Sequence, residues 1–104
     1  MPPNPAYPWQ VRMEFLVHIE IALPPGMPDG ERRELYAAES AQAASLATAG
    51  RLVRLWRIPG RTANWGLWRA NDATELHDAL TSLPLWPYMD IEVMPLARHP
   101  NDPA

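Results

Sequence analysis

The sequence predicts a single α+β domain whose elements follow the order β-α-β-β-α-β. Three observations support this: apolar residues alternate at 14–23, good helix formers dominate 28–49, and two strand-like segments meet at Pro59-Gly60 before a second, shorter helix. With 104 residues, the chain is long enough for one domain with a thin core. Size alone therefore favours self-association, which would bury more surface.

Residues 14–23 predict a half-buried first strand. Polar side chains separate the members of an apolar set that occupies every second position, namely Phe15, Val17, Ile19 and Ile21. Leu16 interrupts the alternation, which predicts partial cover on the second face. Pro24-Pro25-Gly26 then ends the strand.

Residues 28–49 predict the longest helix, with Asp29 as N-cap and Gly50 just past its end. At about 100° per residue, one face collects Leu35, Ala38, Glu39, Gln42, Leu46 and Ala49. Glu39 lies in the middle of this face. Because burying an unpaired carboxylate is unfavourable, Glu39 needs either a partner or a functional role.

Residues 51–58 and 62–69 predict a β-hairpin, and its Pro59-Gly60 pair suits a type II turn. Strict alternation gives the first strand one face made of Leu52, Arg54, Trp56 and Ile58, so Arg57 lies on the other. In the second strand the two faces are Ala63, Trp65, Leu67 and Arg69 against Thr62, Asn64, Gly66 and Trp68.

The remaining elements are a second helix and a last strand. Asp72 and Glu75 predict a capped helix that ends near Ser82. Pro84 and Pro87 form a rigid elbow that leads into a strand at 90–94. This order is the ferredoxin-like arrangement, a four-stranded antiparallel sheet with both helices on one face and the other face uncovered.

The chain divides into a Pro-rich extension at 1–12, a domain at 13–100 and a tail at 101–104. The extension holds four of the thirteen prolines and no periodic pattern, and it reads as disordered or loosely docked. There is no apolar run of membrane-spanning length and no signal peptide, so we expect a cytoplasmic protein without a membrane partner.

Charge and residue usage exclude several classes of function. A net charge of −3, with nine basic residues that are all Arg, argues against nucleic-acid binding and favours recognition of carboxylates. Without Cys there is no disulfide, thiolate nucleophile or Cys-ligated zinc. Three His residues, His18, His77 and His99, lack ligand-like spacing, so no metal is expected.

Four segments carry a resemblance to a known family. They are Leu55-Trp56-Arg57-Ile58-Pro59-Gly60, Ala63-Asn64-Trp65, Leu76-His77-Asp78 and the elbow Ser82-Leu83-Pro84-Leu85-Trp86-Pro87-Tyr88-Met89-Asp90-Ile91-Glu92-Val93, which Arg98-His99-Pro100 follows. In this order, from about Met13 to Pro100, the chain resembles muconolactone isomerase. The resemblance implies a dimeric α+β barrel, with dimers assembling into decamers, in the β-ketoadipate branch of aromatic catabolism.

The implied activity is that of an intramolecular oxidoreductase that transposes a C=C bond. It converts muconolactone to 3-oxoadipate enol-lactone by a 1,3-proton shift through a dienolate, and needs no cofactor. Such a reaction requires one base, donors for the charge that develops on the lactone oxygen, and a cation for the acetate carboxylate.

The resemblance makes Glu39 the candidate base, because it falls at a Glu of the family's helix. Burial on the inward face would raise its affinity for a proton. The structural alternative is an ion pair with Arg54 or Arg57 that holds helix to sheet. Both arginines are candidate anchors for the substrate carboxylate: Arg57 matches the family motif, whereas Arg54 stands where the family carries His.

The other candidate substrate-binding residues are aromatic or polar. Trp56, Asn64 and Trp65 match family positions for ring contacts and an amide donor, and Tyr88 could donate its hydroxyl; for the aromatic residues, packing is the alternative. His18 departs from the family pattern and could act as an extra acid or base. His77 matches the family, but we interpret it as structural.

Two other functions stay open at this point. Larger side chains at Trp65 and Trp86 than the family carries favour a related isomerase or cyclase that acts on a larger enolisable intermediate in natural-product biosynthesis. The other alternative is a non-catalytic dimeric barrel that binds a small ligand.

Overall fold

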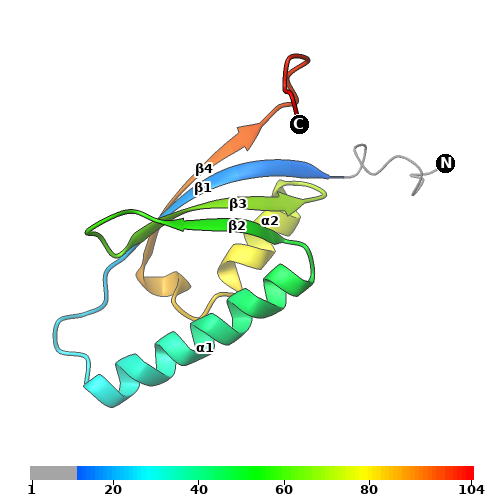
Figure 1. The fold of residues 1–104 in the computed structure, drawn as a ribbon. Coiled ribbons are helices and arrows are strands. Elements are labelled where there is room, and N and C mark those ends of the chain that lie inside the picture. The colour runs from blue at the N-terminus through cyan, green and yellow to red at the C-terminus, as the bar shows by residue number, and fades with distance from the viewer. Residues whose placement is uncertain (1–11) are drawn as a thin grey trace.

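The computed structural model describes residues 12–104, and their four strands form one antiparallel sheet in the order β2-β3-β1-β4 (Figure 1). The elements are β1 (Met13–Ile21), α1 (Asp29–Thr48), β2 (Leu52–Arg57), β3 (Ala63–Ala70), α2 (Ala73–Thr81), the 3₁₀ turn η2 (Trp86–Tyr88) and β4 (Met89–Leu96). The predicted α+β class and element order are confirmed. The predicted extension lies outside the described residues except for Arg12, which is exposed.

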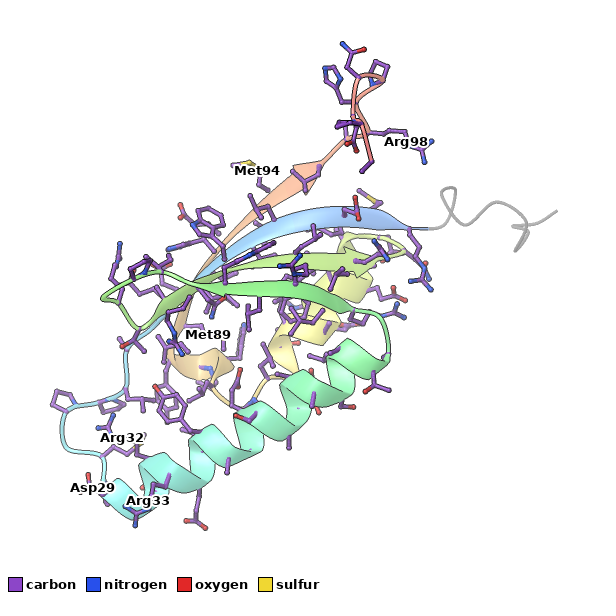
Figure 2. The ribbon with its side chains drawn as sticks, viewed as in Figure 1. Asp29, Arg32, Arg33, Met89, Met94 and Arg98 are labelled. Carbon is purple, nitrogen blue, oxygen red and sulfur yellow. The ribbon has the colours of Figure 1, made fainter. Side chains whose placement is uncertain are left out.

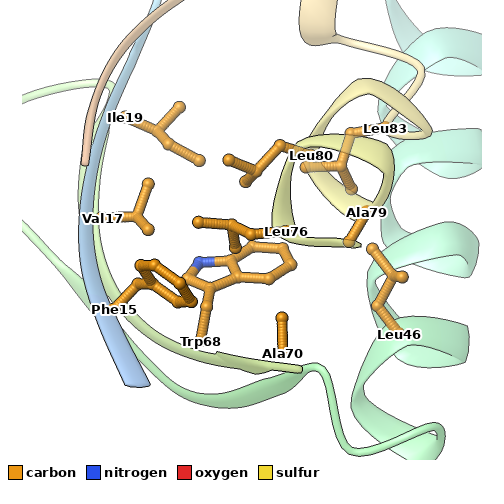
Figure 3. Close-up of a cluster of buried hydrophobic side chains, with 10 residues drawn as sticks. All are labelled: Phe15, Val17, Ile19, Leu46, Trp68, Ala70, Leu76, Ala79, Leu80 and Leu83. Atoms are coloured by element: carbon orange, nitrogen blue, oxygen red, sulfur yellow. The ribbon is translucent and has the colours of Figure 1, made fainter. Parts of the chain in front are cut away.

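Both helices pack on the same face of the sheet, and the core lies between them and β1 and β3 (Figures 1 and 3). The predicted alternation in β1 is confirmed, since Phe15, Val17 and Ile19 are at most 3% exposed. They form one cluster with Leu46, Trp68, Ala70, Leu76, Ala79, Leu80 and Leu83. We call this side of the sheet the helix face.

Helix α1 begins and packs differently from the prediction. Its N-cap is Pro28, in extended backbone and without a side-chain hydrogen bond, so the prediction of Asp29 as N-cap is wrong. Asp29 instead lies in the first turn, where its charge still favours the helix dipole. At the other end Gly50 has φ 80°, as a glycine just past the helix should.

The predicted inward stripe of α1 is only partly correct. Leu46 is buried and Leu35, Glu39 and Gln42 are half-buried, but Ala38 and Ala49 are exposed. Helix α1 packs along β2, at the edge of the sheet, and this contact surface is narrower than the stripe.

The β2–β3 hairpin confirms the type II turn and contains a bulge that the alternation missed. The Arg61 N–H donates to the Ile58 carbonyl at 3.2 Å, and Gly60 has φ 77°. The bulge places Leu52 opposite Trp68 and Arg54 opposite Leu67. Leu52 therefore faces the helices and does not share a face with Arg54, contrary to the prediction.

Helix α2 and the elbow follow the sequence pattern closely. The Asp72 side chain accepts from the Glu75 N–H at 2.8 Å, so this cap is confirmed, and the Glu75 carboxylate accepts from the Asn71 N–H at 2.7 Å. Strand β4 is longer than the predicted 90–94, because it pairs with β1 over the whole range from Ile21 to Glu14.

The second face of the sheet is not covered by either helix (Figure 1). We call it the open face, and its central side chains are Leu16, His18, Arg54, Trp56, Trp65, Leu67, Glu92 and Met94. Figure 2 shows Met94 on the side of β4 away from the helices. Within residues 12–104, no helix combines the length and apolar character of a membrane span.

Candidate active site

The predicted site residues separate onto the two faces of the sheet. Arg57 pairs with Asn64 across β2 and β3, and Asn64 pairs in turn with the core residue Ile19, so both lie on the helix face. Glu39 reaches the same side from α1. The remaining strand residues of the predicted site lie on the open face, namely His18, Arg54, Trp56 and Trp65. A single chain therefore does not bring all of them together.

Glu39 contacts the elbow between α2 and β4. Its Oε1 accepts a hydrogen bond from the Leu85 N–H at 2.9 Å. Desolvation of the half-buried carboxyl raises its pKa above the ordinary value, and the hydrogen bond from Leu85 opposes that shift without cancelling it. Within residues 12–104, Glu39 forms no ion pair, so the predicted alternative of a bridge to Arg54 or Arg57 is not observed.

The composition of the elbow explains why an acceptor is needed at Leu85. Pro84 and Pro87 have no N–H, and the amides of Trp86 and Tyr88 donate to carbonyls within the elbow, at 2.9 Å each. Leu85 is fully buried, and its N–H has the Glu39 carboxylate as its partner. A second bond ties α1 to this region, from Gln42 Nε2 to Ser82 Oγ at 2.9 Å. Glu39 thus has a structural role whatever its chemistry.

Strand β3 carries two buried side-chain polar atoms that find no hydrogen-bond partner within residues 12–104, Asn64 Oδ1 and Trp68 Nε1. Both lie on the helix face, with Gly66 between them. The sequence analysis named Asn64 as a candidate amide donor but did not single out Trp68. The alternation of side chains along the strand could have indicated Trp68 as well, since it places Asn64 and Trp68 on one face.

Arg57 and Tyr88 complete the predicted residues outside the open face. Arg57 is exposed on β2, an edge strand, and forms no ion pair within the described residues. Tyr88 lies in η2, half-buried, three residues from Leu85. His77, which we interpreted as structural, is exposed on α2.

The open-face residues form their own contacts. The His18 and Trp65 rings lie 4.9 Å apart between centroids at 56°, and His18 Nδ1 is 3.5 Å from Glu92 Oε1. Arg54 stacks on Trp56 with its guanidinium carbon 4.9 Å from the ring centroid. The Arg54–Trp56 distance fits a cation–π contact.

Two hollows stand out on the described surface, and Glu39 lines neither of them. One, of about 180 Å³, lies on the open face and is lined by Leu16, Trp65, Glu92, Val93 and Met94. The other, of about 780 Å³, lies where the chain leaves β4, among residues that include Glu14, Arg69, Leu96 and Arg98. Within residues 12–104, no three His, Asp or Glu side chains are grouped as metal ligands.

Comparison with known proteins agrees with the sequence resemblance. The family model described as muconolactone delta-isomerase matches residues 13–102. Curated proteins named muconolactone delta-isomerase are similar to the chain: that of Rhodococcus opacus is 39% identical over 85% of this chain and 95% of its own length, and that of Pseudomonas aeruginosa 43% identical over 86% and 93%. A crystal structure of muconolactone isomerase superposes with a TM-score of 0.83 at 40% identity, over 88% of this chain and 96% of that one.

Proposed function

The chain belongs to the muconolactone delta-isomerase family, and we propose that it converts muconolactone to 3-oxoadipate enol-lactone by moving one C=C bond. The match spans nearly the whole domain, and the relatives are covered almost end to end. The observation that carries the mechanism is the half-buried Glu39, whose pKa is raised and which approaches no cation within the described residues.

Glu39 is the proposed base. In its ionised form it takes the proton from the ring carbon that bears the acetate arm, and the electrons of that C–H bond enter the dienolate. It then returns the proton to the carbon beside the carbonyl. The raised pKa makes it a stronger base than a solvated carboxylate, and the Leu85 N–H orients it through Oε1. Within residues 12–104, Oε2 has no hydrogen-bond partner and is free for the proton.

Arg57 and Asn64 are the proposed substrate-binding residues on the same side. They face each other across β2 and β3, and Arg57 supplies the cation for the acetate carboxylate. Rotating the Asn64 amide by half a turn would exchange Oδ1 for Nδ2 and make it a donor to the lactone oxygen. Its unpaired buried oxygen supports a role in binding, because such a group is unfavourable without a partner.

We further propose that a second copy covers the open face, as in a dimeric α+β barrel. Trp56, Trp65 and Met94 are 44%, 36% and 55% exposed there, alongside the half-buried Leu16 and Leu67. A contiguous apolar patch of this kind on a small protein is typical of an association surface. The second copy would then also lie next to Trp56 and Trp65, which in a single chain are on the opposite side of the sheet from Glu39.

The test of the activity is direct. The purified chain, mixed with muconolactone, should form the enol-lactone, followed by NMR and by the loss of the conjugated absorbance. Glu39→Gln should lower the rate by about 100-fold or more, as removal of a general base does. Glu34→Gln is the matched control, since Glu34 is exposed on the same helix. No rate above buffer would overturn the proposed activity, and a near-normal rate for Glu39→Gln would leave Glu39 only its structural role.

A further inference from the structure

The open face carries opposite charges at its two lateral edges. Arg54 lies on β2, opposite Leu67 of β3. Glu92 lies on β4, opposite His18 of β1. Because β2 and β4 are the outer strands of the sheet, the two charges are separated by its full width, with apolar side chains between them.

These two charges are unmatched, whereas their neighbours are paired. Arg69 binds Glu14 at 2.9 Å and Arg61 binds Glu20. Arg54 forms no ion pair within residues 12–104, and Glu92, whose side chain is 80% exposed, has only His18 at 3.5 Å. Each sheet therefore presents Arg54 as a free cation and, on β4, Glu92 as a nearly free anion toward whatever covers it; Asp90, on the same strand and face, also forms no ion pair within residues 12–104.

The hollow beside Glu92 has the chemistry of a guanidinium site. Its lining combines an aromatic ring, a carboxylate and aliphatic surface, from Trp65, Glu92, Leu16, Val93 and Met94. A planar delocalised cation packs on an aromatic face and donates to a carboxylate at the same time. Arg54 already makes such a contact within its own chain, where its guanidinium carbon lies 4.9 Å from the centroid of the Trp56 ring.

We infer that this hollow receives Arg54 of a second copy of the chain. A two-fold axis makes the contact reciprocal, because Arg54 of each copy then binds in the hollow of the other copy. The apolar centre supplies the buried area and the two Arg54–Glu92 contacts fix the register of the sheets. The inference rests on the self-association proposed above and names its contact.

A charge-reversal experiment on the full chain tests the contact. Arg54→Glu and Glu92→Arg each place like charges in both symmetric contacts, and each should raise the dimer dissociation constant by at least about tenfold, measured by sedimentation and light scattering. An equimolar mixture of the two variants should associate near the wild-type level, because every contact in the mixed dimer is again attractive. The double variant should associate for the same reason.

The control is Arg33→Glu, which makes the same charge change at an exposed position near the start of α1, remote from the open face (Figure 2). It should associate as the wild type does. Circular dichroism checks that each variant folds. If a charge-reversal variant does not fold, Arg54→Gln and Glu92→Gln replace it, and each of these should weaken association less than a reversal does.

The outcomes separate the two proposals. A wild-type chain that stays monomeric at all concentrations overturns the self-association and this contact together. A wild-type dimer whose single variants associate normally, or whose mixed variants do not recover, overturns the Arg54–Glu92 contact alone. Turnover of muconolactone is measured separately, and its result tests neither the self-association nor the Arg54–Glu92 contact.

Discussion

At the scale of single residues, Glu39 combines a structural contact with an altered acidity. Its place in the helical pattern predicted burial and a raised proton affinity; in the structure the carboxyl is half-buried and its pKa is raised. Its partner was not predictable, because the Leu85 N–H lies 46 residues away and becomes available only through the conformation of the elbow. Side-chain pattern indicates where a charge is placed, but it does not identify which backbone donors remain free.

The raised pKa of Glu39 predicts the pH dependence of the reaction. Since the base must be ionised, kcat/KM should rise with pH through an acid limb that lies above the ordinary pKa of a glutamate. The measurement is the pH profile of muconolactone turnover. An acid limb at the ordinary position, or none at all, would contradict Glu39 as the base.

The same shift predicts how Glu39→Gln changes stability with pH. A raised pKa means that the folded state holds the proton more tightly, so the neutral carboxyl is favoured at low pH, and stability falls as pH rises from the unfolded-state pKa through the folded-state pKa. Glutamine can still accept from the Leu85 N–H without a buried charge. We expect the variant to gain stability relative to the wild type as pH rises through this window, in urea unfolding at mildly acidic and mildly alkaline pH. A difference that does not change with pH would contradict this.

Arg57 should affect substrate binding more than chemistry. If it holds the acetate carboxylate equally in the ground and transition states, Arg57→Gln should raise KM by about tenfold or more and leave kcat nearly unchanged. Steady-state kinetics measures both, with Arg33→Gln as the exposed control. A fall in kcat at constant KM would instead place Arg57 in transition-state stabilisation.

The site as a whole was only partly predictable from the sequence. The eight predicted side chains are polar or aromatic and most of them match family positions, but period-two reasoning alone could separate only those on one strand, such as Arg54 and Arg57. Cross-strand register decides the rest: Trp65 pairs with His18, whereas Asn64 pairs with Ile19 of the core. The larger side chain at Trp65 favoured a larger substrate, but in one chain Trp65 lies on the open face, on the other side of the sheet from Glu39.

At the scale of elements, local rules succeeded where they needed only neighbouring residues. Asp72 caps α2 because its own backbone is extended, with φ −158°, whereas Asp29 is preceded by Pro28, which takes the cap position itself. The bulge between Leu52 and Arg54 depends on pairing with β3, and nothing in the sequence of β2 marks it. A single extra residue was enough to move Leu52 to the other face.

Strand β3 depends on Gly66 for its packing. A Cβ at this position would lie 2.6 Å from Trp68 Nε1 and 3.3 Å from Leu55 Cδ1. Trp68 is 2% exposed and packed in the core cluster, so Gly66→Ala should destabilise the fold by about 1–3 kcal/mol, as overpacking does. Chemical denaturation gives the value.

Two controls make the test of Gly66 specific. Gly30→Ala meets no atom within 4 Å and lies in α1, so it should be neutral or stabilising. In a Trp68→Phe background, which lacks the indole nitrogen, Gly66→Ala should cost less than in the wild type. Equal costs in both backgrounds would refute the clash with Trp68.

At the scale of the whole molecule, the chain is a sheet with only one face covered by helices. The order of elements predicted this, because two helices on one side of a four-stranded sheet leave the other side without cover. What the order could not predict is how charge is distributed over that face, since Arg54 and Glu92 become opposite edges only when the strands are arranged as β2-β3-β1-β4. A self-complementary surface is a property of the assembled sheet.

Association through the open face should make stability depend on protein concentration. Leu16 lies at the centre of that face between Leu67 and Met94, on the side of β1 away from the core. A second copy that binds only folded chains raises Tm as concentration rises. Leu16→Glu would bury a charge in the interface and should give a folded monomer whose Tm does not change with concentration, while Ala44→Glu, at an exposed position of α1, should behave as the wild type. Differential scanning calorimetry over a wide concentration range measures this. A wild-type Tm that is constant over the range, or a Leu16→Glu chain that still associates, would show that some other surface holds the copies together or that none does.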